Sequence, residues 1–360
     1  MIPAKERVKN QPDIFLRLAQ SSMTVAKHIR NEFLENSFTV ADKIRELMEQ
    51  KQVEIGIRRL LPYKSKIGKI TACFIDGGVG DVEIFSTVPL MVRGGIFRVK
   101  EGEHDLEKRE TFEFFPVLTG DLDGGDKSRS DYSSVVRIII ELGSVLRVLR
   151  NEKFADVNLI MLHGPLLYRL SAYSEHWFYE SDYLTMLCEE EMGHHMLDSF
   201  YEERKKCQVH QCWCTLYRSE KRIKANCIIA HLLNTAIKES QEKDINLVGV
   251  TERATATELT SIFLQKALEE NPDIAAKYLV NPSGNYKRDT NEIINLTRYT
   301  DAQLCAMILD SGEYLSFYDA KERYSGFSGD LKGFEAKLPQ IGYTYLKSVE
   351  NAMPMRVEVP

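Results

Sequence analysis

Phe74-Ile75-Asp76-Gly77-Gly78 closes an apolar run with a carboxylate and two glycines, and Met161-Leu162-His163-Gly164-Pro165 closes another with an imidazole and one glycine. Glycine lets the backbone turn away and leaves the preceding side chain exposed. Open α/β sheets bind their ligands at such strand ends. An Asp-Gly pair is also a common plain strand end, so each motif alone has two explanations. The two motifs together predict a site.

A third element supports this site. Apolar residues recur at helical spacing from Asp131 to Asn151, which predicts an amphipathic helix. Glu141 lies along the apolar stripe of that helix, between Ile138 and Val145. Because burial of an unpaired charge is prohibitive, this carboxylate requires a salt bridge, a proton or a metal ion. An ion pair with a nearby arginine and a metal site both remain open.

Composition limits the class of protein. The chain has 360 residues, 43% hydrophobic and 28% charged, enough for a large core in one elaborated domain or two. We find no apolar run near the roughly 20 residues of a membrane span and no signal-peptide core. Seven cysteines without a regular framework suit a reducing compartment, so we expect a cytoplasmic protein. A net charge of −6 means that any DNA contact comes from local basic patches.

The order of expected elements indicates the fold. We expect helices from Asp13 to Leu61, then strands at Lys69–Asp76, Val82–Leu90 and Met91–Val99. After the Glu141 helix come a strand at Val157–His163, helices from Tyr183 to Gln241, a strand at Ile245–Val250 and a helix at Thr255–Glu270. This order predicts an α/β, ribonuclease H-like mixed sheet flanked by helices, in which the first and fourth strands are neighbours. Asp76, His163 and Glu141 are then expected to come together.

Five segments fall in the order found in the NurA family, which the chain resembles from about residue 40 to residue 360: IDGG (75–78), IIELGSVLRVL (139–149), VNLIMLHGPL (157–166), LVGVTE (247–252) and RVEVP (356–360). The resemblance implies a Mn²⁺- or Mg²⁺-dependent DNA nuclease of DNA end processing or phage defence. It also implies a homodimer docked on a HerA-type hexameric ATPase. Two ions held by clustered hard ligands activate a water and stabilise the leaving oxygen.

The resemblance assigns catalytic and metal-binding roles to Asp76 and Glu141, and places His163 where the family has an aspartate. Imidazole is neutral and softer than a carboxylate, so metal affinity is expected to fall. Glu252 stands about where the family often has a lysine, and is a candidate replacement carboxylate. Family members continue beyond the RVEVP-like strand to a further histidine that has no counterpart before Pro360. For His163 three alternatives stay open: a one-metal or altered-metal nuclease, an enzyme that uses His163 as acid or base, and an inactive adaptor. A ribonuclease H-like enzyme acting on RNA is a further alternative.

The expected regions are an N-terminal helical region (1–62), a nuclease core (63–270) with a helical insertion at about 171–244, and a C-terminal extension (271–360). The extension contains strand-like segments at Glu313–Tyr318, Ile341–Lys347 and Met355–Val359, which are expected to extend the sheet and to form a dimer or partner surface.

Basic side chains near the expected site are candidates for DNA contacts: Arg58, Arg59, Lys64, Lys66, Lys69, Lys127 and Arg129. A solvated helix end explains the first five equally well. A zinc site at Cys207, His210, Cys212 and Cys214 is disfavoured, because structural zinc sites usually bring two separated ligand pairs. The loop from Asp121 to Asp126 fails as a calcium loop, because Gly125 occupies a ligand position.

Overall fold

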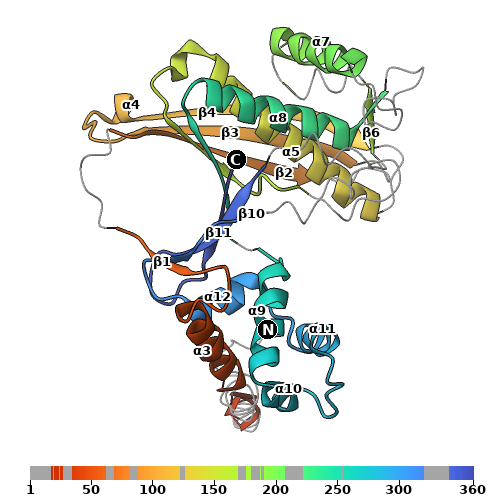
Figure 1. The fold of residues 1–360 in the computed structure, drawn as a ribbon. Helices are drawn as coiled ribbons and strands as arrows, with labels where there is room; N and C mark the ends of the chain where they lie inside the picture. The colour runs from red at the N-terminus through yellow and green to blue at the C-terminus, as the bar shows by residue number, and fades with distance from the viewer. Residues whose placement is uncertain are drawn as a thin grey trace, which may run out of the picture. The chain divides into compact units, whose positions relative to one another are not determined.

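The structure is a computed structural model that describes residues 18, 20–23, 25–26, 35–61, 69–81, 88–121, 126–168, 176–179, 187, 190–206, 222–252, 254–319 and 340–360 (Figure 1). The chain divides into two compact units. One, the helical unit, comprises Met1–Leu60, Arg253–Ser316 and Tyr345–Pro354. The other, the sheet unit, comprises Leu61–Glu252, Phe317–Thr344 and Met355–Pro360. The three regions expected from the sequence remain a prediction.

The sheet unit is built on a mixed sheet. Strands β2 (Thr71–Asp81), β3 (Val88–Lys100) and β4 (Glu110–Asp121) form an antiparallel meander. Strand β5 (Leu159–His163) pairs in parallel with β2, and β8 (Asn246–Thr251) pairs in parallel with β5. Strand β12 (Met355–Val359) follows β8 antiparallel, so the order is β4-β3-β2-β5-β8-β12. This confirms the ribonuclease H-like mixed sheet, with the first and fourth strands adjacent.

The expected end of the first strand at Asp76 is wrong, because β2 continues through Gly77 and Gly78 to Asp81. The expected boundary between two strands at Leu90 is also wrong. Residues 88–100 form the single strand β3, and the third strand of the meander is β4. The cause is an unbroken alternation: Val92 and Ile96 are both fully buried on one face, so nothing turns the chain between them. Gly94 and Gly95, which resemble a turn signal, lie inside the strand.

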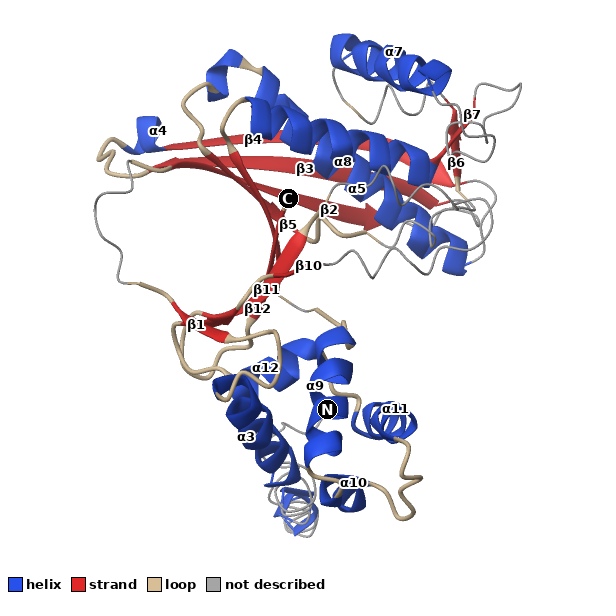
Figure 2. Cartoon of the chain, in the orientation of Figure 1, coloured by secondary structure: helices blue, strands red, loops and turns tan. Residues whose placement is uncertain are grey.

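Helix α5 (Asp126–Arg150) packs on one face of this sheet, against β2 and β3. Gly77 and Gly94 are a cross-strand pair beneath the helix. A Cβ atom at Gly94 would lie 2.7 Å from Ile140 Cγ2, so the close approach of α5 requires glycine there. Helix α8 (Ala225–Glu242) packs beside α5 (Figure 2).

The smaller elements of the sheet unit are α4 (Leu106–Arg109), the 3₁₀ turn η2 (Glu152–Phe154), α7 (Glu190–Lys206) and the two-stranded sheet of β6 (Trp177–Tyr179) and β7 (Arg222–Lys224). Strand β10 (Tyr318–Asp319) pairs with the first part of β11 (Gly342–Lys347). The C-terminal strands thus extend the sheet, as expected. Strand β7 interrupts the stretch from Tyr183 to Gln241 that was expected to be largely helical.

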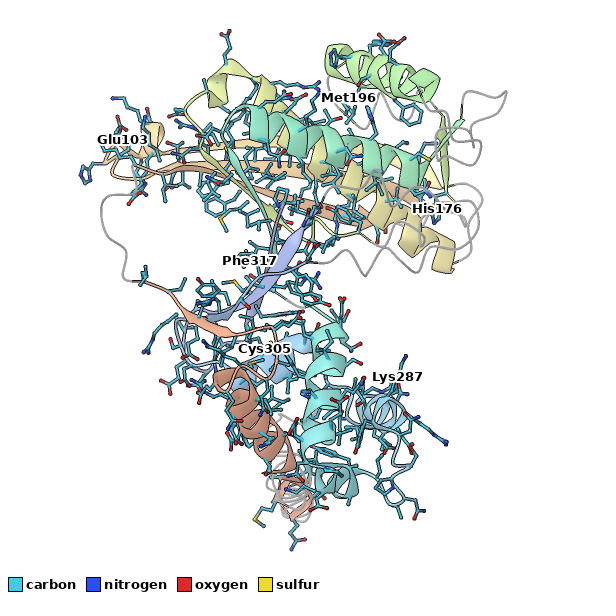
Figure 3. The ribbon with its side chains drawn as sticks, viewed as in Figure 1. Glu103, His176, Met196, Lys287, Cys305 and Phe317 are labelled. Atoms are coloured by element: carbon cyan, nitrogen blue, oxygen red, sulfur yellow. The ribbon has the colours of Figure 1, made fainter. Side chains whose placement is uncertain are left out.

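The helical unit contains α3 (Glu35–Glu49), α9 (Glu258–Glu270), α10 (Asp273–Tyr278), α11 (Tyr286–Thr297) and α12 (Asp301–Ile308). Its core includes Cys305 of α12, which is fully buried (Figure 3). Strand β1 (Ile57–Arg59) pairs with β9 (Glu313–Leu315), so the expected helix up to Leu61 is wrong at its end. The partner strand lies far away in sequence, where local periodicity carries no signal. In the described part of the chain no helix is long and apolar enough to cross a membrane.

Candidate functional site

Asp76 and His163 are brought together by adjacent parallel strands. The register pairs Ile75 with Leu162, so the residues that follow each of them are neighbours. Asp76 Oδ1 lies 3.0 Å from His163 Nδ1, within hydrogen-bond distance. The two side chains are 67% and 55% exposed, respectively, so solvent and ligands reach both. The expected proximity of Asp76 and His163 is present in the structure, although His163 ends β5 and Asp76 lies inside β2. The two strands are drawn in Figure 2.

Glu141 of α5 lies beside this pair and is 2% exposed. A Cβ atom at Gly77 would lie 2.5 Å from Glu141 Oε1, so the carboxylate rests directly on the backbone of β2. The Nε atom of Arg137, one helical turn earlier, lies 3.5 Å from the same oxygen. Glu141 Oε1 makes no hydrogen bond in the structure. The ion-pair and metal explanations for a buried acid both remain compatible with this position.

The surroundings of Glu141 disfavour its charge. Burial raises the pKa of this carboxyl group to about 7, and the nearby Asp76 carboxylate acts in the same direction. Arg137, the Gly77 backbone N–H and His163 oppose the rise in pKa without cancelling it. A bound cation next to Glu141 would favour the charged form. The carboxyl group therefore couples its proton to any positive charge that arrives at the site.

Glu141 and Asp76 face opposite sides of β2. Successive side chains of a strand alternate between its two faces, and Glu141 packs where the side chain of Gly77 would be. Among the described residues, no group of three histidine, cysteine, aspartate or glutamate side chains is close enough to hold a metal ion. The structure thus brings Asp76 and His163 together and places Glu141 on the other face of β2, in contact with Gly77.

The turn after His163 is fixed by a carboxylate that the sequence analysis missed. Glu358 of β12 is fully buried, and its Oε2 accepts hydrogen bonds from the backbone N–H groups of Leu166 (2.6 Å) and Leu167 (2.8 Å). Arg356 neutralises it, with Nε 2.6 Å from Glu358 Oε1. The available signal was the alternation in Arg356-Val357-Glu358-Val359, where the charged positions face inward. Glu358 thereby holds the backbone that presents His163.

The other predicted site residues belong to other elements of the fold or lie outside the described residues. Glu252 is exposed and follows the end of β8, next to the strand of His163. Lys69 is exposed at the start of the sheet unit, and Arg58 and Arg59 are on β1 of the helical unit. Lys127 and Arg129 belong to the first turns of α5. The remaining candidates lie outside the described residues: Lys64, Lys66, Cys207, His210, Cys212 and Cys214.

No protein-family model and no curated protein matches the chain. Several solved structures do. The chain resembles NurA nucleases along most of its length. The NurA nuclease from Sulfolobus solfataricus aligns with 97% of this chain and 80% of its own, at 11% identity and a TM-score of 0.46. A second NurA structure aligns with 94% of this chain and 86% of its own, at 11% identity and a TM-score of 0.44. A NurA bound to dAMP and manganese aligns with 99% and 87%, at 11% identity and a TM-score of 0.34.

The raised pKa of Glu141 makes a prediction for the metal-free protein. Because the folded-state pKa of about 7 exceeds the ordinary 4.5, the folded state binds the proton more tightly than the unfolded state. The contribution of the Glu141 carboxyl group to the free energy of unfolding is greatest below pH 4.5. It falls as the pH rises to about 7, by on the order of 3 kcal/mol. In chelator, Glu141→Gln should therefore raise the free energy of unfolding at pH 8 but not at pH 4.

Urea denaturation at the two pH values measures this difference. Glu107→Gln, which removes an exposed carboxylate from α4, is the matched control and should change little at either pH. An equal stability change of Glu141→Gln at pH 4 and pH 8 contradicts the assignment of a raised pKa to Glu141.

Proposed function

We propose that this protein is a divalent-metal-dependent nuclease whose ion is held by Asp76 and His163. The observation that carries the proposal is the 3.0 Å separation of Asp76 Oδ1 and His163 Nδ1, two exposed side chains on adjacent parallel strands. Neighbouring ligands of an octahedral ion at about 2.0–2.1 Å lie about 2.9 Å apart. The two donor atoms therefore have the spacing that one small divalent ion requires.

Glu141 is the proposed third ligand. Its Oε1 atom makes no hydrogen bond, which leaves an oxygen donor open. It rests where a Cβ atom of Gly77 would lie, in contact with the backbone next to Asp76. Glu252, exposed beyond β8, is a further carboxylate on the neighbouring strand. The proposed donor set consists of hard oxygens and one imidazole, which suits Mn²⁺ and Mg²⁺.

Each side chain has a separate proposed role in hydrolysis. A divalent ion bound here would polarise the phosphodiester and lower the pKa of a water molecule. Asp76 Oδ1 and His163 Nδ1 would both hold the ion, which would take the place of the hydrogen bond between these two atoms. Arg137, half-exposed and packed over Gly77, would place its guanidinium against a phosphate oxygen. Glu358 would keep the backbone after His163 rigid while the substrate binds.

The proposed substrate is DNA, and the proposed setting is a homodimer served by a HerA-type hexameric ATPase. The segments shared with the NurA family support this assignment, and solved NurA structures include one with dAMP and manganese and one with manganese. The test is cleavage of end-labelled DNA and RNA in Mn²⁺, Mg²⁺ or chelator, with and without the cognate ATPase. Mn²⁺-dependent cleavage of DNA alone agrees with the proposal. Cleavage of RNA alone contradicts the proposed substrate, and equal cleavage in chelator contradicts the proposed chemistry.

A second candidate is an adaptor that binds DNA and the ATPase without cutting. One observation favours it: no three-ligand group is formed among the described residues. The resemblance to the NurA family adds the expectation that His163 stands in place of an aspartate. The adaptor still has to bind a motor, so the ATPase should co-purify and the mass should be that of a dimer. Binding of the ATPase with no cleavage in any metal supports the adaptor. A monomer without a bound ATPase speaks against both readings.

Substitution of His163 distinguishes the enzyme from the adaptor. His163→Asp adds a negative charge where cations bind, so Mn²⁺-dependent cleavage should rise several-fold. His163→Ala removes one of the two close donors and should lower cleavage at least tenfold. Both effects are measured as initial rates over a range of Mn²⁺ concentrations. If neither variant changes the rate or the Mn²⁺ dependence, His163 is not a ligand and the adaptor is the better assignment.

A further inference from the structure

The face of the sheet opposite α5 displays a row of aromatic rings. The strand registers place Phe74 of β2 next to Phe97 of β3, and Phe97 next to Phe112 of β4. Ring centroids are 6.4 Å apart for Phe74 and Phe97, 6.2 Å for Phe97 and Phe112, and 4.0 Å for Phe112 and Phe114. We call these four rings the aromatic face. They form one continuous apolar surface across three strands.

The aromatic face is open to solvent. Phe74 is 40% exposed, Phe112 50% and Phe114 55%. Scattered single apolar residues are normal on a protein surface, but a contiguous group of this kind marks a binding site. The same strands bury their other face against α5, so the core does not need these rings. Their exposure therefore calls for an occupant.

The face leads directly to the candidate metal ligands. Phe74 and Asp76 are two residues apart on β2, so their side chains share one face and lie about 7 Å apart along the strand. Met161, which pairs with Phe74, is likewise two residues before His163 on β5. A ligand that lies on the aromatic face therefore extends to the Asp76 and His163 side chains. A second copy of the chain bound to these rings would cover Asp76 and His163. A substrate of the site, by contrast, has to reach these two side chains.

A cation accompanies the rings. The guanidinium carbon of Arg93 lies 5.9 Å from the centroid of the Phe114 ring. Arg93 pairs with Gly78, two residues beyond Asp76, and its Nε lies 3.0 Å from the position of a Cβ atom on that glycine. Exposed rings with an adjacent guanidinium match the chemistry of a chain that alternates flat apolar groups with anions. Single-stranded nucleic acid is such a chain, because its bases stack on aromatic side chains and its phosphates bind cations.

We propose that the aromatic face binds the unpaired bases of single-stranded DNA and delivers the backbone to Asp76 and His163, with Arg93 on a phosphate. In a duplex the base faces are stacked on one another and only their edges are accessible, so the rings select single strands. The proposal rests on the proposed function for the direction of delivery. Binding itself requires no cleavage and is testable alone.

The test is fluorescence anisotropy in chelator, with a fluorescein-labelled single strand of about 20 nucleotides and its duplex. Stacking on one ring is lost in Phe112→Ala and in Phe114→Ala, so each should bind the single strand about tenfold more weakly. Duplex affinity should stay unchanged. Phe38→Ala is the matched control, because Phe38 is a 51% exposed ring on α3 of the helical unit. The exposed positions leave folding intact, which far-UV circular dichroism verifies.

The proposal is overturned if Phe112→Ala and Phe114→Ala both bind the single strand as tightly as Phe38→Ala does. It is also overturned if the wild type binds the duplex as tightly as the single strand. A fall from dimer to monomer mass in the ring variants with unchanged DNA affinity also overturns it, and assigns the face to a second copy. Weaker single-strand binding in the variants sustains the proposal even if no metal supports cleavage, in which case only the proposed function fails. Normal cleavage with unchanged affinity in the variants removes the proposal alone.

Discussion

Replacing Asp76 by alanine should abolish Mn²⁺-dependent cleavage and leave the protein folded. Asp76 is the carboxylate of the Asp76–His163 pair, and without it the ion loses one of the two donors that lie closest together. A loss of at least a thousandfold in rate is expected when the ion's position depends on that ligand. Asp76 is 67% exposed, so its removal should change the free energy of unfolding by less than about 0.5 kcal/mol.

The rate of cleavage of end-labelled DNA and a urea melt measure the two effects separately. Asp198→Ala removes an exposed carboxylate from α7 and is the control for loss of charge. Cleavage by Asp76→Ala at the wild-type rate would remove Asp76 from the site and with it the proposed mechanism.

Replacing Gly77 by alanine is expected to inactivate the protein through space rather than charge. The new Cβ atom would lie 2.5 Å from Glu141 Oε1 and 2.7 Å from Arg137 Cγ, so both side chains have to move. Overpacking of this kind destabilises by about 1–3 kcal/mol. It also pushes the Glu141 carboxylate away from the backbone next to Asp76. We expect cleavage to fall at least a hundredfold. The change in stability does not explain this loss as long as most of the protein stays folded.

Gly80→Ala is a matched control in the same strand, because the nearest atom to its Cβ position is Met91 O at 4.0 Å. Cleavage rates and unfolding free energies of the two variants are compared under the same conditions. Equal cleavage by Gly77→Ala and Gly80→Ala would show that Glu141 does not act past Gly77, and would leave Asp76 and His163 as the whole site.

The sequence was sufficient for those parts of the fold that depend on short-range order. The neighbouring positions of the strands that contain Asp76 and His163 were expected from the order of the elements. The periodicity around Glu141 identifies the buried face of its helix. It was insufficient where a distant partner decides. Strand β1 exists because β9 pairs with it, 254 or more residues away by the register of Arg59 with Glu313. Glu358 binds the turn after His163 from the far end of the chain.

The relation between Glu141 and Asp76 also escaped sequence reasoning. Helical periodicity showed that Glu141 points to the sheet, but the residue it meets depends on how α5 lies over β2. It meets Gly77, and strand alternation then directs the Asp76 side chain to the other face. The aromatic face was hidden for a similar reason. Phe74, Phe97, Phe112 and Phe114 become neighbours only through the register of three strands, one of which was assigned incorrectly.

The central claim is that Asp76 and His163 hold a divalent ion, and Mn²⁺ binding tests it most directly. Free Mn²⁺ gives an electron paramagnetic resonance signal that is lost on binding, so titration of the ion into protein measures occupancy without any substrate. We predict that the wild type binds Mn²⁺, that Asp76→Ala and His163→Ala bind it at least tenfold more weakly, and that Asp198→Ala binds like the wild type. Equal Mn²⁺ binding by Asp76→Ala and the wild type would contradict the claim.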